Sequence, residues 1–381
     1  MYDVCIIGGG PAGATLARLL PAGLRVLVVD RRRLDRPHRE GEPTKLCGGL
    51  LAPAAQRELA RQGLGVPASV IAGPQLFAVR VVDHVSGDIR HYQRFYTNVD
   101  RDSFDRWLLS LAPDRVDTLF GFGAYRVEVS EGEAQVWLRS ANGASASVCA
   151  RTVVGADGAA SIVARTLGRR RGISDYVAVQ GHFAAAGGDP HYGAYFDEDL
   201  TDFYGWTIPK GDSVSVGVAL RSGPGARSAF ERFVTRLCAA GLPLGAVTGV
   251  TSAPLRRPAS ARDFLLGTDT LLCVGEAAGL ISASSAEGIS YALRSGAACA
   301  AALRGGPDGA AVRYRLAVAP IVMDALGKVG KARFIYTRAL RRAVMRSGVT
   351  AIRCADPDGL SHALLGGGSD RLVDLAAQRG R

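Results

Sequence analysis

The chain has 381 residues, of which 48% are hydrophobic and 21% charged, a composition typical of a globular protein with one large or two interlocked domains. No apolar run is long enough to span a membrane, no leader precedes the first strand, and the seven scattered cysteines suggest neither a disulfide framework nor a metal site, so we expect a cytoplasmic protein. The net charge of +11 comes almost entirely from arginine spread along the chain, which favours acidic small ligands over nucleic acid.

The first thirty residues predict a nucleotide-binding βαβ unit. Tyr2 to Ile7 has the pattern of a buried strand, Ala14 to Leu20 that of a helix, and Arg25 to Val29 that of a second buried strand. A complete G-x-G-x-x-G follows the first strand, and an acidic residue follows the second. This combination is typical of a dinucleotide site, and we expect FAD.

Each residue type in this unit has a physical reason. Gly8 allows the tight turn, Gly10 lets the backbone approach a pyrophosphate, and Gly13 lets the helix pack closely on the strand. The helix N-terminus offers free N–H groups to phosphates, and the Asp30 carboxylate accepts a hydrogen bond from a ribose hydroxyl. The cofactor contacts expected in this unit are Gly8, Gly10, Pro11, Ala12, Gly13, Asp30 and Arg31.

Further along the chain, strand-like and helix-like segments alternate. We expect helices at 53–62, from Asp100, at 227–240, from about 287 to 304 and within 310–347, and a short final helix after the glycines at 366–368. We expect strands at 77–82, 89–96, 152–154 and 270–274 and several short ones within 176–220, with 124–129, 134–139 and 145–149 as a β-meander outside the main sheet.

The order of these elements predicts an α/β fold: a Rossmann-type, glutathione-reductase-like FAD-binding domain, a β-sheet substrate domain and C-terminal helices. The FAD-binding domain is expected to be discontinuous, from 1–75, 98–175 and 265–310. The substrate-binding sheet is expected from 76–97 and 176–264, and the C-terminal helical region from 311–381.

Three motifs in a fixed order make the chain recognisable: the glycine turn at 8–13, GADG at 155–158 and GEAAG at 275–279. Together they resemble the FAD-dependent superfamily of aromatic-ring hydroxylases and geranylgeranyl reductases, over most of residues 1–305. The resemblance implies that Asp157 orients the pyrophosphate region, that Gly275 and Glu276 meet the ribityl chain and phosphates, and that Arg101 reaches FAD from a helix start.

The finer resemblance is to the geranylgeranyl-reductase-like branch. KLCGG at 45–49 is similar to its loop over the flavin, YGWTIPKGD at 204–212 to its substrate-lining strand, and EGISYALRSG at 287–296 to its helix start under the flavin. The resemblance implies cofactor contacts at Lys45, Cys47, Gly48, Gly49, Gly288 and Ile289. The chain departs from the pattern at Leu46, Glu276, Ala283 and Ala286, which lie around the reactive edge of the flavin.

Several residues allow a structural or a functional interpretation. Cys47 is either a thiol acidified by a nearby cation and backbone N–H groups or a small residue packed on the flavin. Tyr204 and Trp206 lie two apart on one strand, so they form either an aromatic substrate wall or ordinary sheet packing. Lys210 is interpreted as a turn residue. The basic residues between Lys328 and Arg353 form either a solvated helix or a surface for an anionic carrier, a coenzyme tail or a membrane.

Three functions remain open. The first is an NAD(P)H-dependent monooxygenase acting on an aromatic or other apolar small molecule, which can carry an acidic or carrier-linked tail. The second is a reductase of C=C bonds in an isoprenoid or polyene, with Cys47 beside the substrate, and the third is a non-catalytic flavin-binding protein. Because no second G-x-G-x-x-G is present, NAD(P)H is expected to bind transiently, or an external reductase supplies the electrons. Halogenation is disfavoured because no lysine lies between Lys45 and Lys210.

Overall fold

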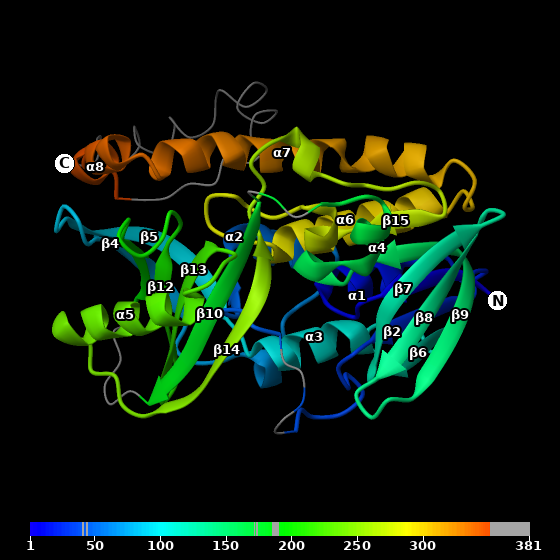
Figure 1. The fold of residues 1–381 in the computed structure, drawn as a ribbon, viewed down its shortest axis with the longest axis horizontal. Coiled ribbons are helices and arrows are strands. Elements are labelled where there is room, and N and C mark those ends of the chain that lie inside the picture. Colours follow the sequence, from blue (N-terminus) through cyan, green and yellow to red (C-terminus); the bar gives the residue numbers. More distant parts are fainter. Residues whose placement is uncertain (40–41, 43–44, 171, 173, 185–189, 351–381) are drawn as a thin grey trace, which may run out of the picture. The chain divides into compact units, whose positions relative to one another are not determined.

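The computed structural model describes residues 1–39, 42, 45–170, 172, 174–184 and 190–350. Within these residues the chain forms two β-sheets, with helices packed on them (Figure 1). The predicted fold class, an α/β flavoprotein fold with a second β-sheet and C-terminal helices, is confirmed. The glycines at 366–368, the final helix predicted after them and Cys354 lie outside the described residues.

The first sheet has a parallel core of five strands in the order β6-β2-β1-β9-β15, with the β7–β8 hairpin attached beside β9. Its strands are β1 (Tyr2–Ile7), β2 (Val26–Asp30), β6 (Val116–Phe120), β7 (Phe122–Ser130), β8 (Glu133–Ser140), β9 (Ser145–Gly155) and β15 (Leu271–Cys273). β1 and β2 are continuous apolar runs because helices cover both faces of a parallel sheet. The strand β6 was not predicted.

The predicted β-meander does not lie outside the main sheet. The run at 145–149 and the run at 152–154 are one continuous strand, β9, rather than two. Its first half pairs antiparallel with β8 and its second half pairs parallel with β1. A strand can change partners along its length because each edge offers its N–H and C=O groups independently, so the meander extends the nucleotide-binding sheet itself.

The second sheet has the order β14-β10-β13-β12-β11-β4-β5-β3. Its strands are β3 (Leu50–Leu51), β4 (Leu76–Asp83), β5 (Ile89–Asn98), β10 (Asp175–Ala184), β11 (Tyr192–Phe196), β12 (Gly205–Lys210), β13 (Ser213–Arg221) and β14 (Val247–Arg256). β11 pairs parallel with β4, and the other neighbours pair antiparallel. β3 lies within the segment 1–75 but pairs with this sheet, and the domain boundaries stay a prediction.

The helices are α1 (Pro11–Leu19), α2 (Pro53–Arg61), α3 (Arg101–Ser110), α4 (Ile162–Thr166), α5 (Ala226–Ala239), α6 (Ile289–Leu303), α7 (Ala310–Ile335) and α8 (Arg338–Arg346). α3 begins where predicted, because the Asp100 side chain accepts a hydrogen bond from the Ser103 N–H at 2.8 Å. α6 lies directly against α1, since a Cβ at Gly296 would stand only 2.5 Å from the Ala12 carbonyl oxygen. None of the described helices is long and apolar enough to cross a bilayer.

One face of the second sheet packs on α5. Phe230 and Phe233 of this helix join Tyr195, Val216 and other sheet residues in a buried cluster. The neighbouring strand residue Gly205 has no room for a side chain, because the Phe233 ring lies 2.5 Å from the position of its missing Cβ. The next residue of β12, Trp206, therefore points to the opposite face of the sheet, because successive side chains of a strand alternate between its faces.

Candidate active site

The glycine turn leaves space for a ligand at one of its glycines. Gly8 has φ of +107°, and a Cβ there would lie 2.5 Å from the Ala156 carbonyl oxygen, while one at Gly13 would lie 1.9 Å from the Gly8 carbonyl oxygen. A Cβ at Gly10 would instead meet nothing closer than 3.9 Å. α1 begins directly behind Gly10 with Pro11 and has no side-chain cap. These features fit a pyrophosphate group at the start of α1.

Asp30 lies at the end of β2, as predicted, and is held by neighbouring groups. One carboxylate oxygen accepts the Gly9 N–H at 2.8 Å, and the other accepts the Arg32 N–H at 2.8 Å. Arg31, which we expected near the cofactor, is exposed, whereas Arg32 is buried. Strand alternation gave no signal for Arg32, because β2 ends at Asp30 and Arg32 lies in the bend that follows.

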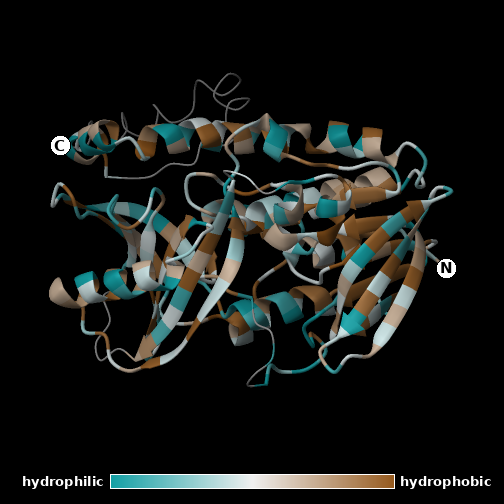
Figure 2. Cartoon of the chain, viewed as in Figure 1, coloured by the Kyte–Doolittle hydropathy of each residue, from teal (hydrophilic) through white to brown (hydrophobic). Residues whose placement is uncertain are grey.

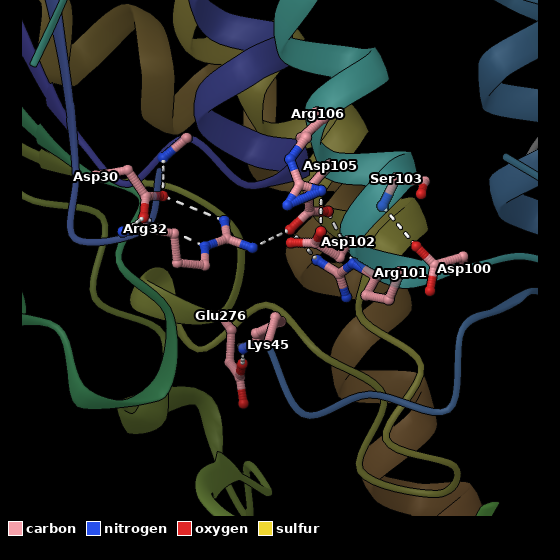
Figure 3. Close-up of polar contacts among 11 residues, drawn as sticks. Asp30, Arg32, Lys45, Asp100, Arg101, Asp102, Ser103, Asp105, Arg106 and Glu276 are labelled. Carbon is pink, nitrogen blue, oxygen red and sulfur yellow. Dashed lines mark hydrogen bonds and ion pairs between the residues drawn. The ribbon is translucent and has the colours of Figure 1, made fainter. Parts of the chain in front are cut away.

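A row of alternating charges runs from Asp30 at the end of β2 to Arg101 at the start of α3 (Figure 3). The Arg32 guanidinium binds Asp30 at 3.2 Å and Asp105 at 2.8 Å, and Arg101 binds the other oxygen of Asp105 at 2.8 Å. Asp105 is fully buried. Burial by itself raises the pKa of Asp105, but the two guanidiniums lower it more, so the carboxyl stays ionised. The Asp105 carboxylate therefore holds the Arg101 guanidinium in place beside Cys47.

The loop at 45–49 lies against β12. A Cβ at Gly48 would be 2.4 Å from the Ile208 Cδ1, and one at Gly49 would be 2.3 Å from the Val99 carbonyl oxygen. A side chain at Gly48 or Gly49 would therefore collide with β12 or with the residue that follows β5, and the contact of these glycines with the flavin stays a prediction.

The Cys47 thiol is partly buried in this loop. The Gly49 N–H donates to its Sγ at 3.5 Å. Burial raises the pKa of Cys47, but Arg101, the Gly49 N–H and Lys45 lower it more, so the net direction is downward. A thiol with a lowered pKa forms thiolate more readily and is more reactive.

Lys210 is not a simple turn residue, and that expectation is wrong. Its Nζ turns back into the protein and donates to the Val99 carbonyl oxygen at 2.9 Å and to the Asn98 side chain. It lies 2.7 Å from the position of a Cβ at Gly49. Burial lowers the pKa of Lys210 to about 8, and the neighbouring Cys47 acts in the opposite direction. The sequence could not reveal this contact, because it joins the end of β12 to the end of β5.

Tyr204 and Trp206 lie on the sheet face opposite α5. Both rings are buried, with centroids 5.8 Å apart. The Trp206 indole lies over Gly217, where a Cβ would be only 2.2 Å away, and its N–H donates to the Gln180 side chain at 3.1 Å. The Tyr204 hydroxyl donates to the Ser285 carbonyl oxygen at 2.8 Å. The Tyr204 hydroxyl thus contacts the segment that precedes α6, whereas the Trp206 indole packs within the sheet; we refer to this pair as the aromatic wall.

The GADG turn supplies a buried acceptor without a partner. One Asp157 oxygen accepts the Ile162 N–H at 2.8 Å. The other is buried, and no described residue hydrogen-bonds to it. Burial raises the pKa of Asp157. An unpaired buried acceptor is costly unless a ligand satisfies it, so Asp157 fits the expected contact with FAD.

The remaining predicted cofactor residues lie at the ends of β15 and α6. Gly275 has φ of +56°, its N–H donates to Ser295, and a Cβ there would lie 3.1 Å from the Ala12 side chain. Glu276 accepts the Arg256 N–H at 2.9 Å and lies 3.8 Å from the Lys45 Nζ. Gly288 is the N-cap of α6 and Ile289 its first residue. Their contacts to FAD stay predictions.

Comparisons with known proteins agree with this geometry. The model of the FAD binding domain matches residues 1–44. Protein CbrA of Escherichia coli O6:H1 is 38% identical over 353 residues, which are 92% of this chain and 94% of that protein. CbrA of Shigella sonnei shows the same identity over 92% of this chain and 98% of its own length.

Two solved structures share the fold. A geranylgeranyl bacteriochlorophyll reductase-like protein from Thermoplasma acidophilum has a TM-score of 0.78 at 20% identity, covering 99% of this chain and 98% of that chain. PqsL, a probable FAD-dependent monooxygenase from Pseudomonas aeruginosa, has a TM-score of 0.64 at 24% identity, covering 91% and 99%. With this identity over nearly its whole length, the chain belongs to the family of protein CbrA, and its first 44 residues match the FAD binding domain.

Proposed function

We propose that the protein is an NAD(P)H-dependent monooxygenase that hydroxylates an aromatic or other apolar small molecule. The observation that carries the proposal is the aromatic wall. The polar atoms of Tyr204 and Trp206 are already bound to protein groups, so the two rings would offer a substrate only their apolar faces. Flat aromatic substrates stack on such rings.

The chain's own residues supply binding and orientation for this chemistry. FAD, when bound, would supply the redox chemistry that links reduced nicotinamide to oxygen. The glycine turn and Asp157 would hold its pyrophosphate, while the loop at 45–49 and the start of α6 would flank its ring. Overall one oxygen atom enters the substrate as a hydroxyl and the other leaves as water, with one NAD(P)H and one proton consumed.

The substrate class is also supported by a structural neighbour. PqsL has been crystallised with 2-aminobenzoylacetate, an aromatic keto acid. An acid on the substrate suits this chain, because Lys45 and Arg101 both lie beside the Cys47 loop. We therefore propose an aromatic substrate with an acidic or carrier-linked tail.

A C=C reductase is the second candidate, and Cys47 favours it. The neighbouring cations hold the pKa of the Cys47 thiol below its ordinary value, which is the kind of tuning that general acid–base catalysis uses. In that reaction a hydride and a proton add across the double bond and no oxygen is consumed. The fold similarity to a geranylgeranyl reductase-like protein supports the same alternative.

Oxygen labelling distinguishes the two reactions. Purified protein is supplied with NADH or NADPH and candidate substrates under ¹⁸O₂, and the products are analysed by mass spectrometry. We expect label in the product and no turnover without oxygen. Saturated product formed in the absence of oxygen would reject the monooxygenase. Turnover only with an added flavin reductase would assign the electrons to an external partner instead of bound NAD(P)H.

The aromatic wall can be tested with a matched pair of variants. Trp206→Leu should raise the KM for an aromatic substrate about tenfold, because a lost aromatic contact costs about 1 kcal/mol and its buried area adds to this. Trp137→Leu in β8 removes an indole that packs under Arg126, remote from the wall, and should leave KM unchanged. Equal effects of the two changes would argue against a substrate role for Trp206.

The basic C-terminal helices divide into two parts. Arg341 is buried and paired with Asp83 at 2.7 Å and with Glu198, so it serves the fold. The outer face of α7 exposes apolar residues, among them Leu316 (72% exposed) and Met323 (67%), and hydrophilic residues are mixed among them (Figure 2). α7 has one acidic residue, Asp324, and it is ion-paired with Lys328.

We propose that this face of α7 binds the surface of a membrane that contains anionic lipids. Exposed apolar residues on a helix that is rich in basic residues are typical of such a contact. The protein should sediment with phosphatidylglycerol vesicles and not with phosphatidylcholine vesicles. Leu316→Glu should abolish binding, whereas Val247→Glu, at an exposed valine of β14, should not. Loss of a dimer on Leu316→Glu, with no vesicle binding by the unchanged protein, would assign the face to a second copy. A cytoplasmic location likewise remains a proposal.

A further inference from the structure

Side chains from three distant segments hold three consecutive carbonyl groups just before α6. Arg257 Nε donates to the Ala283 carbonyl oxygen at 3.1 Å, the Tyr336 hydroxyl to that of Ser284 at 3.1 Å, and the Tyr204 hydroxyl to that of Ser285 at 2.8 Å. Arg257 follows β14, Tyr336 ends α7 and Tyr204 precedes β12. We refer to Arg257, Tyr336 and Tyr204 as the carbonyl clamp.

The carbonyl clamp is itself firmly packed. The Arg257 guanidinium carbon lies 4.2 Å from the Phe203 ring centroid and 4.4 Å from that of Tyr336. Its Nη1 also donates to the Tyr176 hydroxyl at 3.0 Å. Burial raises the pKa of Tyr336 and of Tyr204, so both phenols stay protonated and keep donating. Stacked cation–π contacts and buried hydrogen bonds leave these donors little freedom to move.

The segment that the clamp holds contains a strained residue. Ala286 has φ of +51°, a left-handed conformation that residues with a Cβ rarely adopt. Its N–H donates to the Ser282 carbonyl oxygen at 2.9 Å, and the Ser282 N–H donates to the Glu287 carbonyl oxygen at 2.9 Å. The result is a tight turn that leads directly into Gly288, the N-cap of α6. Such strain persists only where surrounding contacts over-determine it.

α6 packs on the nucleotide-binding segment. α6 packs on α1 through Gly296, and the Gly275 N–H donates to Ser295 of α6. The Glu287 carboxylate accepts the Ser290 N–H in the first turn of α6 at 2.8 Å, and burial raises the pKa of Glu287. The N-terminus of a helix carries partial positive charge and stabilises a negative group placed near it. Reduced flavin is more negative than oxidised flavin, so the position of this helix end would affect the two forms unequally.

We propose that Tyr336, together with Arg257 and Tyr204, is a positioning residue that holds the turn at Ala286 and so fixes the N-terminus of α6 beside the flavin. Tyr336 lies at the end of α7, a helix that none of the sequence motifs includes. It depends on the FAD site but not on which reaction the flavin performs, so its tests remain valid if hydroxylation fails.

The first test is hydrogen exchange on the full-length, FAD-loaded protein. Tyr336→Phe removes one hydrogen bond from the turn, and loss of about 1 kcal/mol should speed exchange of the amides at 284–287 about fivefold. Tyr314→Phe is the matched control, because the Tyr314 hydroxyl on the same helix donates to the Cys273 carbonyl oxygen at 2.9 Å. It should leave those amides unchanged. Equal exchange in the two variants would reject the clamp, and Tyr204→Phe provides the same test if Tyr336→Phe does not fold.

The second test is the affinity of the protein for the two redox forms of FAD. If α6 shifts, Tyr336→Phe should weaken binding of reduced FAD about fivefold more than binding of oxidised FAD, which corresponds to a midpoint potential about 20 mV more negative. Tyr314→Phe should not change the potential. A role confined to protein stability would lower the melting temperature of both variants and leave both potentials in place, which would overturn the proposal.

Strain at Ala286 can be tested separately. Ala286→Gly relieves the left-handed strain, because glycine adopts positive φ without a steric penalty. In that background Tyr336→Phe should change amide exchange and potential by less than half of its effect in the unaltered chain. Additive effects would show that the clamp and the strained turn are independent, and would reject this part of the proposal.

Discussion

Arg32 and Asp105 form a buried ion pair, with Arg32 Nη1 2.8 Å from Asp105 Oδ2, and this pair ties the end of β2 to α3. Asp105 binds Arg101 in the same way. The position of Arg101 beside Cys47 therefore depends on the Asp105 carboxylate. A substitution of Asp105 should disturb both Arg32, at the end of β2, and Arg101, beside Cys47.

The first prediction concerns this carboxylate. Asp105→Asn leaves two buried guanidiniums without their shared counter-ion and should lower the free energy of unfolding by about 3–5 kcal/mol. Asp102→Asn on the same helix breaks the partly exposed pair with Arg106, which lies nearer the surface than Asp105, and should cost less than about 1 kcal/mol. Urea denaturation at pH 7 measures both. A similar small loss for the two variants would contradict the buried network.

The same group predicts an acid dependence. The folded pKa of Asp105 lies below its unfolded value, so its contribution is complete above about pH 4, the ordinary value, and is lost as the pH falls through the folded pKa. Stability measured from pH 7 to pH 3 should fall less steeply in Asp105→Asn than in the unaltered protein. Parallel curves would mean that Asp105 does not titrate with folding.

The second prediction separates cofactor loss from misfolding. Gly10→Val should fold, because the position of its Cβ is open, and should lose FAD, because the branched side chain would occupy the space of the pyrophosphate. Gly23→Val, at a glycine with no atom within 4 Å of its missing Cβ, should keep FAD. Flavin absorbance and circular dichroism of the purified variants decide the outcome. A yellow, fully loaded Gly10→Val protein would exclude this turn as the nucleotide site.

The third prediction concerns Cys47. If the protein is a monooxygenase, Cys47→Ser should retain FAD and change the rate by less than about threefold, because the cofactor performs the difficult step. If the thiol transfers a proton to a reduced double bond, the same change should slow product formation about 10²-fold or more. Cys238→Ser, at an exposed thiol, is the control. Only the first outcome is compatible with the function proposed above.

The fourth prediction follows from Lys210. Its folded pKa of about 8 lies below the unfolded value of about 10.4, so the folded protein binds fewer protons than the unfolded chain between these values. The free energy of unfolding should therefore rise as the pH increases from about 8 to 10. Lys210→Met should flatten this rise, whereas Lys328→Met on α7 should preserve it. If the free energy of unfolding of Lys210→Met rises with pH as steeply as that of the unaltered protein, burial does not lower the pKa of Lys210.

The elements that the sequence predicted well are those with a local cause. β1, α1 and β2 follow from two apolar runs and a glycine turn, and α1 begins at Pro11, where a proline fits the first helical position. β6 escaped notice because only one of its residues, Val116, is buried, so its pattern is not that of a core strand. The continuity of β9 was missed because its polar first half resembles a separate hairpin strand.

The residues that sequence reasoning missed at the site depend on tertiary contacts. Arg32 and Asp105 lie 73 positions apart, and Lys210 meets the end of β5 across 111 positions. Tyr336 reaches Ser284 from the far end of α7. Motifs located the cofactor turn, but they did not indicate which side chains from distant parts of the sequence would meet to support it.

α7 also acts as a spacer of fixed length. Its 26 residues make a rod of about 39 Å, and the 22 positions from Tyr314, whose hydroxyl binds Cys273 of β15, to Tyr336, which binds Ser284, span about 33 Å. The two tyrosines are separated by about six full turns, so both hydroxyls leave the helix on nearly the same side. A single residue inserted near Gly327 would rotate Tyr336 by about 100° away from Ser284 while Tyr314 stayed in place. The length of α7, as well as its composition, is therefore under constraint, and homologous chains with a different helix length must reach the turn before α6 in another way.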